Sequence, residues 1–133
     1  MPGETNLQTL LKTLEPALHT GNYVYCRIAN ASAIQSDGVL LLFKETEGHT
    51  VIIKKEMADD LQLPYTFVAS RITLKIYSSL EAVGITAAFS TALSAVGISC
   101  KLVAAFYHDP IFVNTKHSGE AMEILTALSR IKG

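Results

Sequence analysis

The alternation of apolar and polar positions is clearest over residues 72–131, where two periodicities follow one another. In residues 72–77 the apolar side chains Ile72, Leu74 and Ile76 occupy every second position, which predicts a half-buried strand. From residue 85 the apolar positions follow the spacing of one helix face, and Gly97 is placed to end that helix. A strand over residues 98–107, a turn at 108–110 and a return strand over 111–113 are expected next.

A last helix is predicted to begin at Ser118 as its N-cap. Its buried face is expected to hold Ala121, Ile124, Leu125, Leu128 and Ile131. The order strand, helix, strand, strand, helix places helices on one face of an antiparallel sheet. The predicted fold class is therefore α+β, of the ferredoxin-like type, and Phe89, Phe106 and Phe112 are expected in its core.

The first half of the chain is predicted to contain shorter elements. Leu7, Leu10, Leu11 and Leu14 form a helical stripe that Pro16 should end. Strands are predicted over residues 23–28, 38–43, 50–53 and 65–69, with a short helix over 55–61 whose inward side chains are Met57, Ala58 and Leu61. Residues 38–43 are apolar on both faces, which favours a central place in the sheet. The two halves repeat one another loosely, and the predicted division is residues 1–70 and 71–133, the first a degenerate module because it lacks a full crossover helix.

Composition narrows the choice of partners. Charged residues make up only 17% of the chain and its mean hydropathy is +0.29, so we expect excess apolar surface to be covered in a homo-oligomer. The net charge of −1 and the scattered lysines argue against a nucleic-acid partner. No apolar run approaches the roughly 20 residues of a membrane helix, and no signal peptide is apparent. With Cys26 and Cys100 predicted to be buried free thiols, the expected location is the cytoplasm.

The sequence contains little that would indicate a catalytic function. Phosphate-loop, dinucleotide and protease motifs are absent, and Ser78 and Ser79 lack the glycines of a nucleophile elbow. The four histidines lack metal-ligand spacing, so a polar hairpin is favoured over a metal site at His108, Asp109 and His117. We expect no catalytic residue, no metal and no cofactor, and the protein is predicted not to be an enzyme.

The turn before the helix at residue 85 offers one binding feature. Unpaired backbone N–H groups at a helix start can hold a carboxylate, and Gly84 has no side chain to block its approach. In the alternative interpretation, Gly84 permits a tight turn and has no role in binding. The residue types leave both interpretations open. Solvation is favoured over ammonium binding for Glu81, and a structural turn role is favoured for Asp109.

Three segments of the second half resemble the ACT domain, the βαββαβ module that senses amino acids. They are residues 72–85, the run Ala95-Val96-Gly97-Ile98-Ser99, and residues 106–113. The chain is most similar to small bacterial tandem-ACT proteins of unassigned role, and more distantly to the CASTOR arginine sensors and the aspartokinase regulatory domains. The resemblance covers the second half well and the first half weakly, and Val83-Gly84 replaces the Pro-Gly pair that many ACT domains have there.

The resemblance implies a non-catalytic regulatory module that pairs side by side and binds ligands at module interfaces, against the loop after the first strand. Carried onto this chain, the implied ligand-binding residues are Ser79, Leu80, Glu81, Val83, Gly84, Ile85 and Thr86, with Tyr107, His108 and Asp109 at the hairpin turn. The expected function is binding of an amino acid or related metabolite, with the output passed to an unidentified protein partner. The alternative is a structural or interaction protein that oligomerises through its sheets without a ligand.

Overall fold

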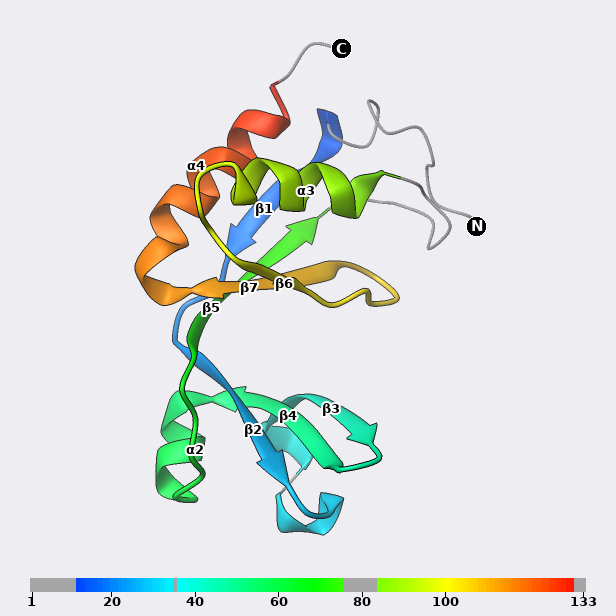
Figure 1. Ribbon diagram of the computed structural model, residues 1–133. Coiled ribbons are helices and arrows are strands. Elements are labelled where there is room, and N and C mark those ends of the chain that lie inside the picture. The colour runs from blue at the N-terminus through cyan, green and yellow to red at the C-terminus, as the bar shows by residue number, and fades with distance from the viewer. Residues whose placement is uncertain (1–11, 35, 76–83, 131–133) are drawn as a thin grey trace. The chain divides into compact units, whose positions relative to one another are not determined.

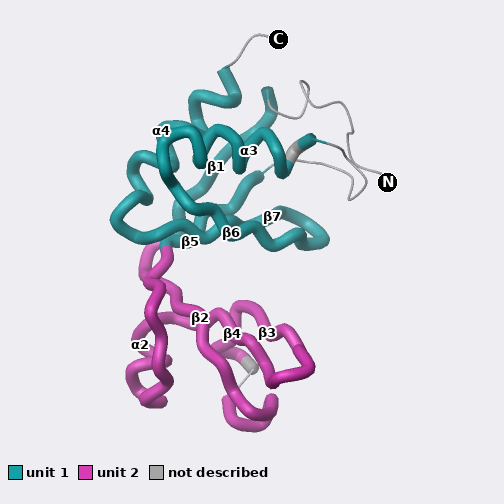
Figure 2. The backbone as a smooth tube through the Cα atoms, in the orientation of Figure 1, with its two compact units in different colours: residues 1–19, 70–133 teal, residues 20–69 magenta. Residues whose placement is uncertain are grey.

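The computed structural model describes residues 12–34, 36–75 and 84–130 of the chain, which form an α+β fold of antiparallel strands and few helices (Figure 1). The chain divides into two compact units (Figure 2). Unit 1 contains residues 1–19 and 70–133, and unit 2 contains residues 20–69. Unit 1 is thus built from two segments that unit 2 separates in the sequence.

Unit 1 contains four strands in the order β1-β5-β7-β6 and two helices in its described part. Strand β5 begins in unit 2 and continues into unit 1, where it pairs antiparallel with β1. Strands β6 and β7 form an antiparallel pair, with Cys100 opposite Val113. The bounds are β1 (Glu15–Leu18), β5 (Val68–Lys75), α3 (Ile85–Ser94), β6 (Cys100–Leu102), β7 (Asp109–Asn114), the 3-10 turn η3 (Thr115–His117) and α4 (Ser118–Leu128).

The core of unit 1 lies between the sheet and the two helices, which cover one face of it (Figure 1). Strands β5 and β7 contribute alternate residues to this core, Ile72 and Leu74 from β5 and Ile111 and Val113 from β7. The helices contribute Phe89, Leu93, Ala121, Leu125 and Leu128. The periodicities predicted for β5, α3 and α4 are therefore confirmed, whereas Ile76 and Ile131 lie outside the described residues.

Gly97 ends α3 as predicted, with the hydrogen bonds of a Schellman motif. The N–H of Gly97 donates to the Ser94 carbonyl and the N–H of Ile98 donates to the Leu93 carbonyl, both at 3.0 Å. Gly97 has φ +80°, a left-handed conformation that glycine adopts without a steric penalty. Leu93 and Ile98, which this motif brings together, are both buried in the core of unit 1.

Several predictions for the second half are wrong in detail. Phe106 is 82% exposed rather than buried, because β6 ends at Leu102 and the chain leaves the sheet well before residue 106. Strand β7 already begins at Asp109, so residues 109 and 110 belong to the strand and not only to the turn. Ser118 is the first residue of α4, and His117 occupies the N-cap without a side-chain hydrogen bond.

The first strand of unit 1 was not predicted. Pro16 does lie beyond the helical residues 12 and 13, but it belongs to β1, where it is opposite Leu74 of β5. Strand β1 lies at one end of the strand order in unit 1, a position in which proline is tolerated. Leu7, Leu10 and Leu11 lie outside the described residues, and Leu14 is buried in the core.

Unit 2 is a small sheet in the order β3-β4-β2-β5 with one helix. Of strand β5, only the first two residues belong to unit 2. There Val68 pairs with Val24 and Ala69 pairs with Tyr23 of β2. Residues 65–69 and 72–77 were predicted as separate strands, but β5 runs unbroken from Val68 to Lys75. The bounds are β2 (Tyr23–Ile28), the 3-10 turns η1 (Ala31–Ala33) and η2 (Ser36–Gly38), β3 (Val39–Glu45), β4 (Gly48–Lys54) and α2 (Lys55–Asp60).

The core of unit 2 lies on one face of this sheet, together with Ala58 of α2. Val24, Cys26 and Ile28 alternate along β2 and meet Val51 and Ile53 of β4. The side chains between them, including Tyr25 and Arg27, consequently lie on the opposite face. The helix predicted over residues 55–61 is confirmed with Ala58 buried, but Leu61 is exposed instead of inward.

Strand β3 was predicted to be central and lies at one end of the strand order in the described part of unit 2. Its pairing with β4 leaves Leu40, Leu42 and Phe43 exposed to 38%, 41% and 62%. A run that is apolar on both faces normally indicates burial by neighbours on both sides. Here the strand carries three large apolar side chains at the surface of unit 2.

Cys26 and Cys100 are free thiols, as predicted; Cys26 is buried and Cys100 is half-buried. Burial raises the pKa of both thiols above the ordinary value, which keeps them protonated. Among the described residues, no helix has the length and apolar character needed to cross a membrane.

Candidate functional site

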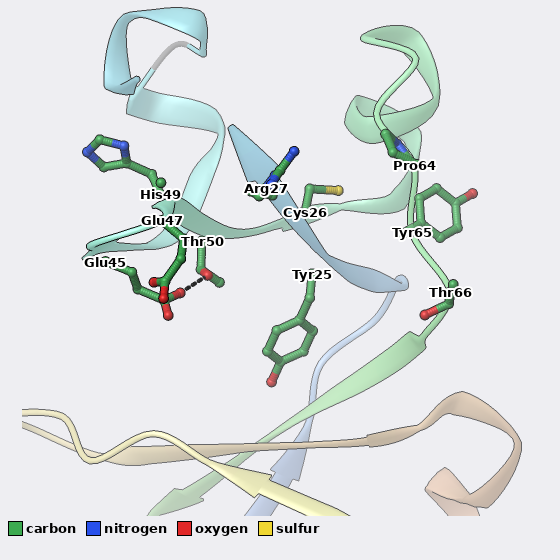
Figure 3. A pocket seen from close by; sticks show the side chains of 11 residues that line it. Tyr25, Cys26, Arg27, Glu45, Glu47, His49, Thr50, Pro64, Tyr65 and Thr66 are labelled. Atoms are coloured by element: carbon green, nitrogen blue, oxygen red, sulfur yellow. Dashed lines mark hydrogen bonds between the residues drawn. The ribbon is translucent and has the colours of Figure 1, made fainter. Parts of the chain in front are cut away.

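A pocket of about 680 Å³ lies within unit 2 (Figure 3). Three parts of the chain form it: strand β2, the hairpin between β3 and β4, and the segment that follows α2. The lining residues are Tyr25, Cys26, Arg27, Glu45, Glu47, Gly48, His49, Thr50, Pro64, Tyr65 and Thr66.

The sheet register places three polar side chains of this pocket on one face. Arg27 of β2 is directly opposite Thr50 of β4, and Phe43 of β3 is opposite Thr50 on its other side. Glu45 follows Phe43 by two residues and so lies on the same face. The Thr50 hydroxyl donates a hydrogen bond to the Glu45 carboxylate, the bond drawn in Figure 3. Thr50 therefore positions this carboxylate on the face that carries Arg27.

The hairpin reaches this geometry through Gly48, which opens β4. Gly48 has φ +147°, a conformation that side chains rarely adopt. A Cβ added there would lie 3.3 Å from the Ile28 carbonyl oxygen and 3.8 Å from Cγ of Arg27. The absence of a side chain thus lets the hairpin approach β2 and the stem of Arg27 closely.

Tyr65 forms a wall of the pocket that is held by a small polar network. Its hydroxyl donates to Asp59 Oδ1 at 2.6 Å, and Lys55 Nζ contacts Asp59 Oδ2 at 3.1 Å. The hydrogen bond from Tyr65, followed by that from Lys55, lowers the pKa of the Asp59 carboxyl. Lys55 Nζ also lies 5.9 Å from the centre of the Tyr65 ring. Because Lys55 and Asp59 both belong to α2, this network ties the ring to the helix.

The charged groups of the pocket are not paired with one another. Among the residues that the structure describes, no ion pair joins Arg27 to Glu45 or Glu47. All three side chains are exposed, so a bound ligand could reach them. Arg27 offers a planar set of donors that suits a carboxylate, and the two glutamates offer acceptors for a cationic group.

Cys26 and His49 also line the pocket, but their side chains differ in setting from those of the charged residues. The Cys26 side chain belongs to the core of unit 2 on the other face of the sheet. Nδ1 of His49 is buried and has no hydrogen-bond partner in the described part of the chain. In that same part, no group of three His, Cys, Asp or Glu residues could hold a metal ion. The lining groups of this pocket with side chains suited to contact a ligand are Arg27, Glu45, Glu47 and the two tyrosines.

The binding residues predicted near the start of α3 are described only in part. Ser79, Leu80, Glu81 and Val83 lie outside the described residues. Gly84 precedes α3 with φ +94°, the left-handed conformation that a tight turn requires, and its carbonyl accepts the N–H of Ala88. Ile85 is the first residue of α3, and the next residue, Thr86, is exposed.

The other predicted binding residues lie on a separate loop of unit 1, between β6 and β7. Tyr107 is 80% exposed and packs edge-to-face on Phe106, with ring centres 5.0 Å apart. His108 is exposed as well. Asp109 Oδ1 accepts the N–H of Ala105 at 2.9 Å, which is the structural turn role that the sequence favoured.

The pocket of unit 2 was not predicted from the sequence, in which the implied ligand-binding residues all lie in the second half of the chain. A signal was present in the alternation of Tyr25 and Arg27 along β2 and in two glutamates at the hairpin, Glu45 at the end of β3 and Glu47 in the turn. Only the register of β2 on β4, however, shows that Arg27 and Thr50 are neighbours.

Comparisons with known proteins agree with this architecture. The ACT domain family matches twice, over residues 2–70 and over residues 69–127. The chain belongs to the ACT domain family and carries two ACT modules in tandem, which confirms the resemblance seen in the sequence. No curated protein matches the chain significantly.

The chain is similar in structure to a Vibrio cholerae protein of unknown function described as a possible transport protein. The two are 38% identical with a TM-score of 0.85, over 92% of this chain and 95% of that one. The regulatory subunit of aspartate kinase from Thermus thermophilus shares the fold at 9% identity and a TM-score of 0.64, over 85% of this chain and 95% of that one. A protein from Agrobacterium tumefaciens also shares the fold, at 15% identity and a TM-score of 0.64, over 87% of this chain and 89% of that one.

Proposed function

We propose that this protein is a non-catalytic regulatory protein that binds a small molecule, and that its ligand is an amino acid or a related metabolite. The observation that carries the proposal is the pocket of unit 2, whose volume of about 680 Å³ falls in the range of metabolite sites. Its unpaired guanidinium and carboxylates match the two charges of an amino acid. Membership of the ACT family and the fold shared with an aspartate kinase regulatory subunit support the same reading.

The proposed mechanism is a population shift. A ligand that binds one arrangement of the protein more tightly raises the population of that arrangement, which a protein partner then recognises. We propose that the protein acts in the cytoplasm as a homo-oligomer in which ACT modules of neighbouring copies pair, with residues 1–70 and 71–133 as the two modules. The binding residues predicted before and at the start of α3, together with residues 107–109, remain a second candidate site at such a module interface.

A thermal-shift screen of the twenty amino acids tests the proposal. A ligand at one hundred times its dissociation constant stabilises the folded protein by about 2.7 kcal/mol, which raises Tm measurably. We expect at least one amino acid at millimolar concentration to raise Tm. No shift with any amino acid or related metabolite would contradict the proposed function.

The alternative function, an interaction protein that needs no ligand, is favoured by one specific observation. Leu40, Leu42 and Phe43 are exposed on strand β3, and exposed apolar strands at a sheet edge are templates for pairing with another chain. This alternative predicts an oligomer whose size does not change with any metabolite. Sedimentation velocity of the protein and of Phe43→Lys would then show dissociation by the substitution and no response to amino acids.

A further inference from the structure

We propose that unit 1 binds a phosphate group on the face of its sheet opposite the two helices, where strands β1 and β5 pair (Figure 1). Strand β5 contributes Ile72 and Leu74 to the core of unit 1, so the side chains that alternate with them lie on the other face. These alternating side chains belong to Arg71, Thr73 and Lys75. Two cations and a hydroxyl therefore share one side of this strand.

A histidine at the end of the neighbouring strand completes the group. The backbone N–H of His19 donates to the Arg71 carbonyl at 2.9 Å, which extends the pairing of β1 with β5 by one residue. A hydrogen bond of 2.5 Å joins Nε2 of His19 and the Thr73 hydroxyl, so the imidazole leans diagonally along the ladder toward Thr73. Because Arg71 and Lys75 flank Thr73 on this face, the imidazole lies between the positions of two cations.

Both positive charges act on this imidazole. Burial is the main cause that lowers the pKa of His19, and repulsion by the charges of Arg71 and of Lys75 follows. An anion bound beside the imidazole would be attracted to both cations and would favour the protonated form of His19. The three side chains therefore converge on a region where negative charge is stabilised.

The neighbouring strands of unit 1 do not cancel this charge. Glu15 of β1 is opposite Lys75 and lies on the same face, but no ion pair joins the two among the described residues. On the other side of β5, the residues of β7 that alternate with its core positions include Phe112 and Asn114, which are uncharged. The charges that face His19 from β1, β5 and β7 are thus two cations and one carboxylate, which sum to +1.

A phosphate group suits these donors better than a carboxylate does. The guanidinium, ammonium, imidazole and hydroxyl groups together offer more donors than the two oxygens of a carboxylate can accept, whereas a phosphate monoester has three strong acceptor oxygens. The planar donors of an arginine also match the geometry of a phosphate. Lys75 is exposed, and His19 and Arg71 are half-buried, so a small anion can reach the group.

The experiment follows the imidazole of His19 by NMR over a pH titration of the full chain, with and without sodium sulfate. Sulfate is the probe because it is tetrahedral and keeps its charge throughout the titration. A bound anion should raise the pKa of His19 by about 1, and the effect should saturate with sulfate concentration. Sodium chloride at equal ionic strength controls for screening of the two cations and should raise this pKa less.

Substitutions assign the effect to this face. His19→Gln identifies the His19 signal among those of the four histidines. Lys75→Met should raise the pKa of His19 without sulfate, because one repelling charge is removed, and should abolish most of the response to sulfate. Lys44→Met is the matched control, since Lys44 is an exposed lysine on β3 of unit 2. Circular dichroism of each variant checks that it folds.

Isothermal titration calorimetry then distinguishes the source of the phosphate group. Tighter binding of glycerol 3-phosphate than of inorganic phosphate would support a phosphorylated metabolite as the ligand. Equal or tighter binding of inorganic phosphate would support the free ion. Failure of both to bind would overturn the proposal.

Four results of the NMR titration would contradict the inference. Equal effects of sulfate and chloride would mean that no anion binds beside His19, and an effect of sulfate that never saturates would indicate an adventitious ion only. A full response to sulfate in Lys75→Met would overturn the assignment to this face. An equal response to sodium acetate would show that the site does not select a tetrahedral anion. These results are independent of the proposed function, because the pocket that carries it lies in unit 2.

Discussion

Arg27 on β2 and Thr50 on β4 are direct partners in an antiparallel ladder, and both lie on the face of unit 2 opposite its core. Thr50 in turn hydrogen-bonds the carboxylate of Glu45 on β3. Thr50 therefore has a cation as its cross-strand neighbour and an anion as its hydrogen-bond partner, and no ion pair joins the two charges among the described residues. Such unpaired charges on one face can engage a ligand that carries both signs.

Thr50→Val should weaken amino-acid binding while barely affecting stability. The substitution keeps the branched shape that suits a strand but removes the hydroxyl that donates to Glu45. Calorimetric titration should show a loss of affinity, and Thr50→Ser, which keeps the hydroxyl, should retain most of it. Equal affinities for the valine and serine variants would show that Thr50 does not position Glu45.

Gly97→Ala should destabilise the protein by about 1 kcal/mol. The φ of +80° at Gly97 imposes a steric penalty on alanine, although nothing lies within 4 Å of an added Cβ. Gly119→Ala is the matched control, because Gly119 lies in α4 and its added Cβ also meets nothing within 4 Å. Gly119→Ala should raise the free energy of unfolding by up to about 1 kcal/mol. Urea unfolding should show opposite signs for the two variants.

Phe89→Ala should cost about 3–5 kcal/mol, because the Phe89 side chain is fully buried in the core of unit 1 and its removal leaves a cavity. Phe106→Ala removes the same side chain from a position that is 82% exposed, and its effect should stay within about 0.5 kcal/mol. Thermal unfolding of both variants measures the contrast. A large loss at Phe106 would mean that the loop packs against something in solution.

Stability should fall as the pH is lowered through about 6.5, partly through His19. Burial, followed by the charges of Arg71 and Lys75, lowers the pKa of His19 below its ordinary value of 6.5. Between the two pKa values the unfolded chain binds more protons than the folded one, so acid favours unfolding there. The loss levels off below the folded-state pKa.

The test is the difference between wild type and His19→Gln in urea unfolding at a series of pH values. This comparison removes the contribution of all other titrating groups. The His19→Gln variant should lack part of the wild-type decrease below pH 6.5. His108→Gln, at an exposed position, serves as the control and should follow the wild type.

The sequence predicts those parts of the fold that depend on local periodicity. The alternation at Ile72 and Leu74, the helix face around Phe89 and the stop at Gly97 are each visible within a few residues. Strand β1 was missed because Pro16 signals a break locally, whereas its place is decided by pairing with Leu74.

Exposure and site geometry depend on contacts that the local pattern does not contain. Phe106 and Phe43 look like core residues by type, but the ends of β6 and the strand order leave both exposed. Similarly, Arg27 and Thr50 are far apart in the sequence, and only the register of β2 on β4 makes them neighbours. The pocket of unit 2 could not be found from residue types alone for this reason.

The interleaved order of the two units has a consequence for synthesis on the ribosome. Residues 15–18 pair with residues 72–75, so this part of unit 1 cannot assemble until the whole of unit 2 has been translated. Unit 2, by contrast, is continuous and can acquire its native contacts as soon as residue 69 has left the exit tunnel. The amino-terminal segment therefore remains unpaired until residues 72–75 have been synthesised, whereas unit 2 in the middle of the chain can fold first.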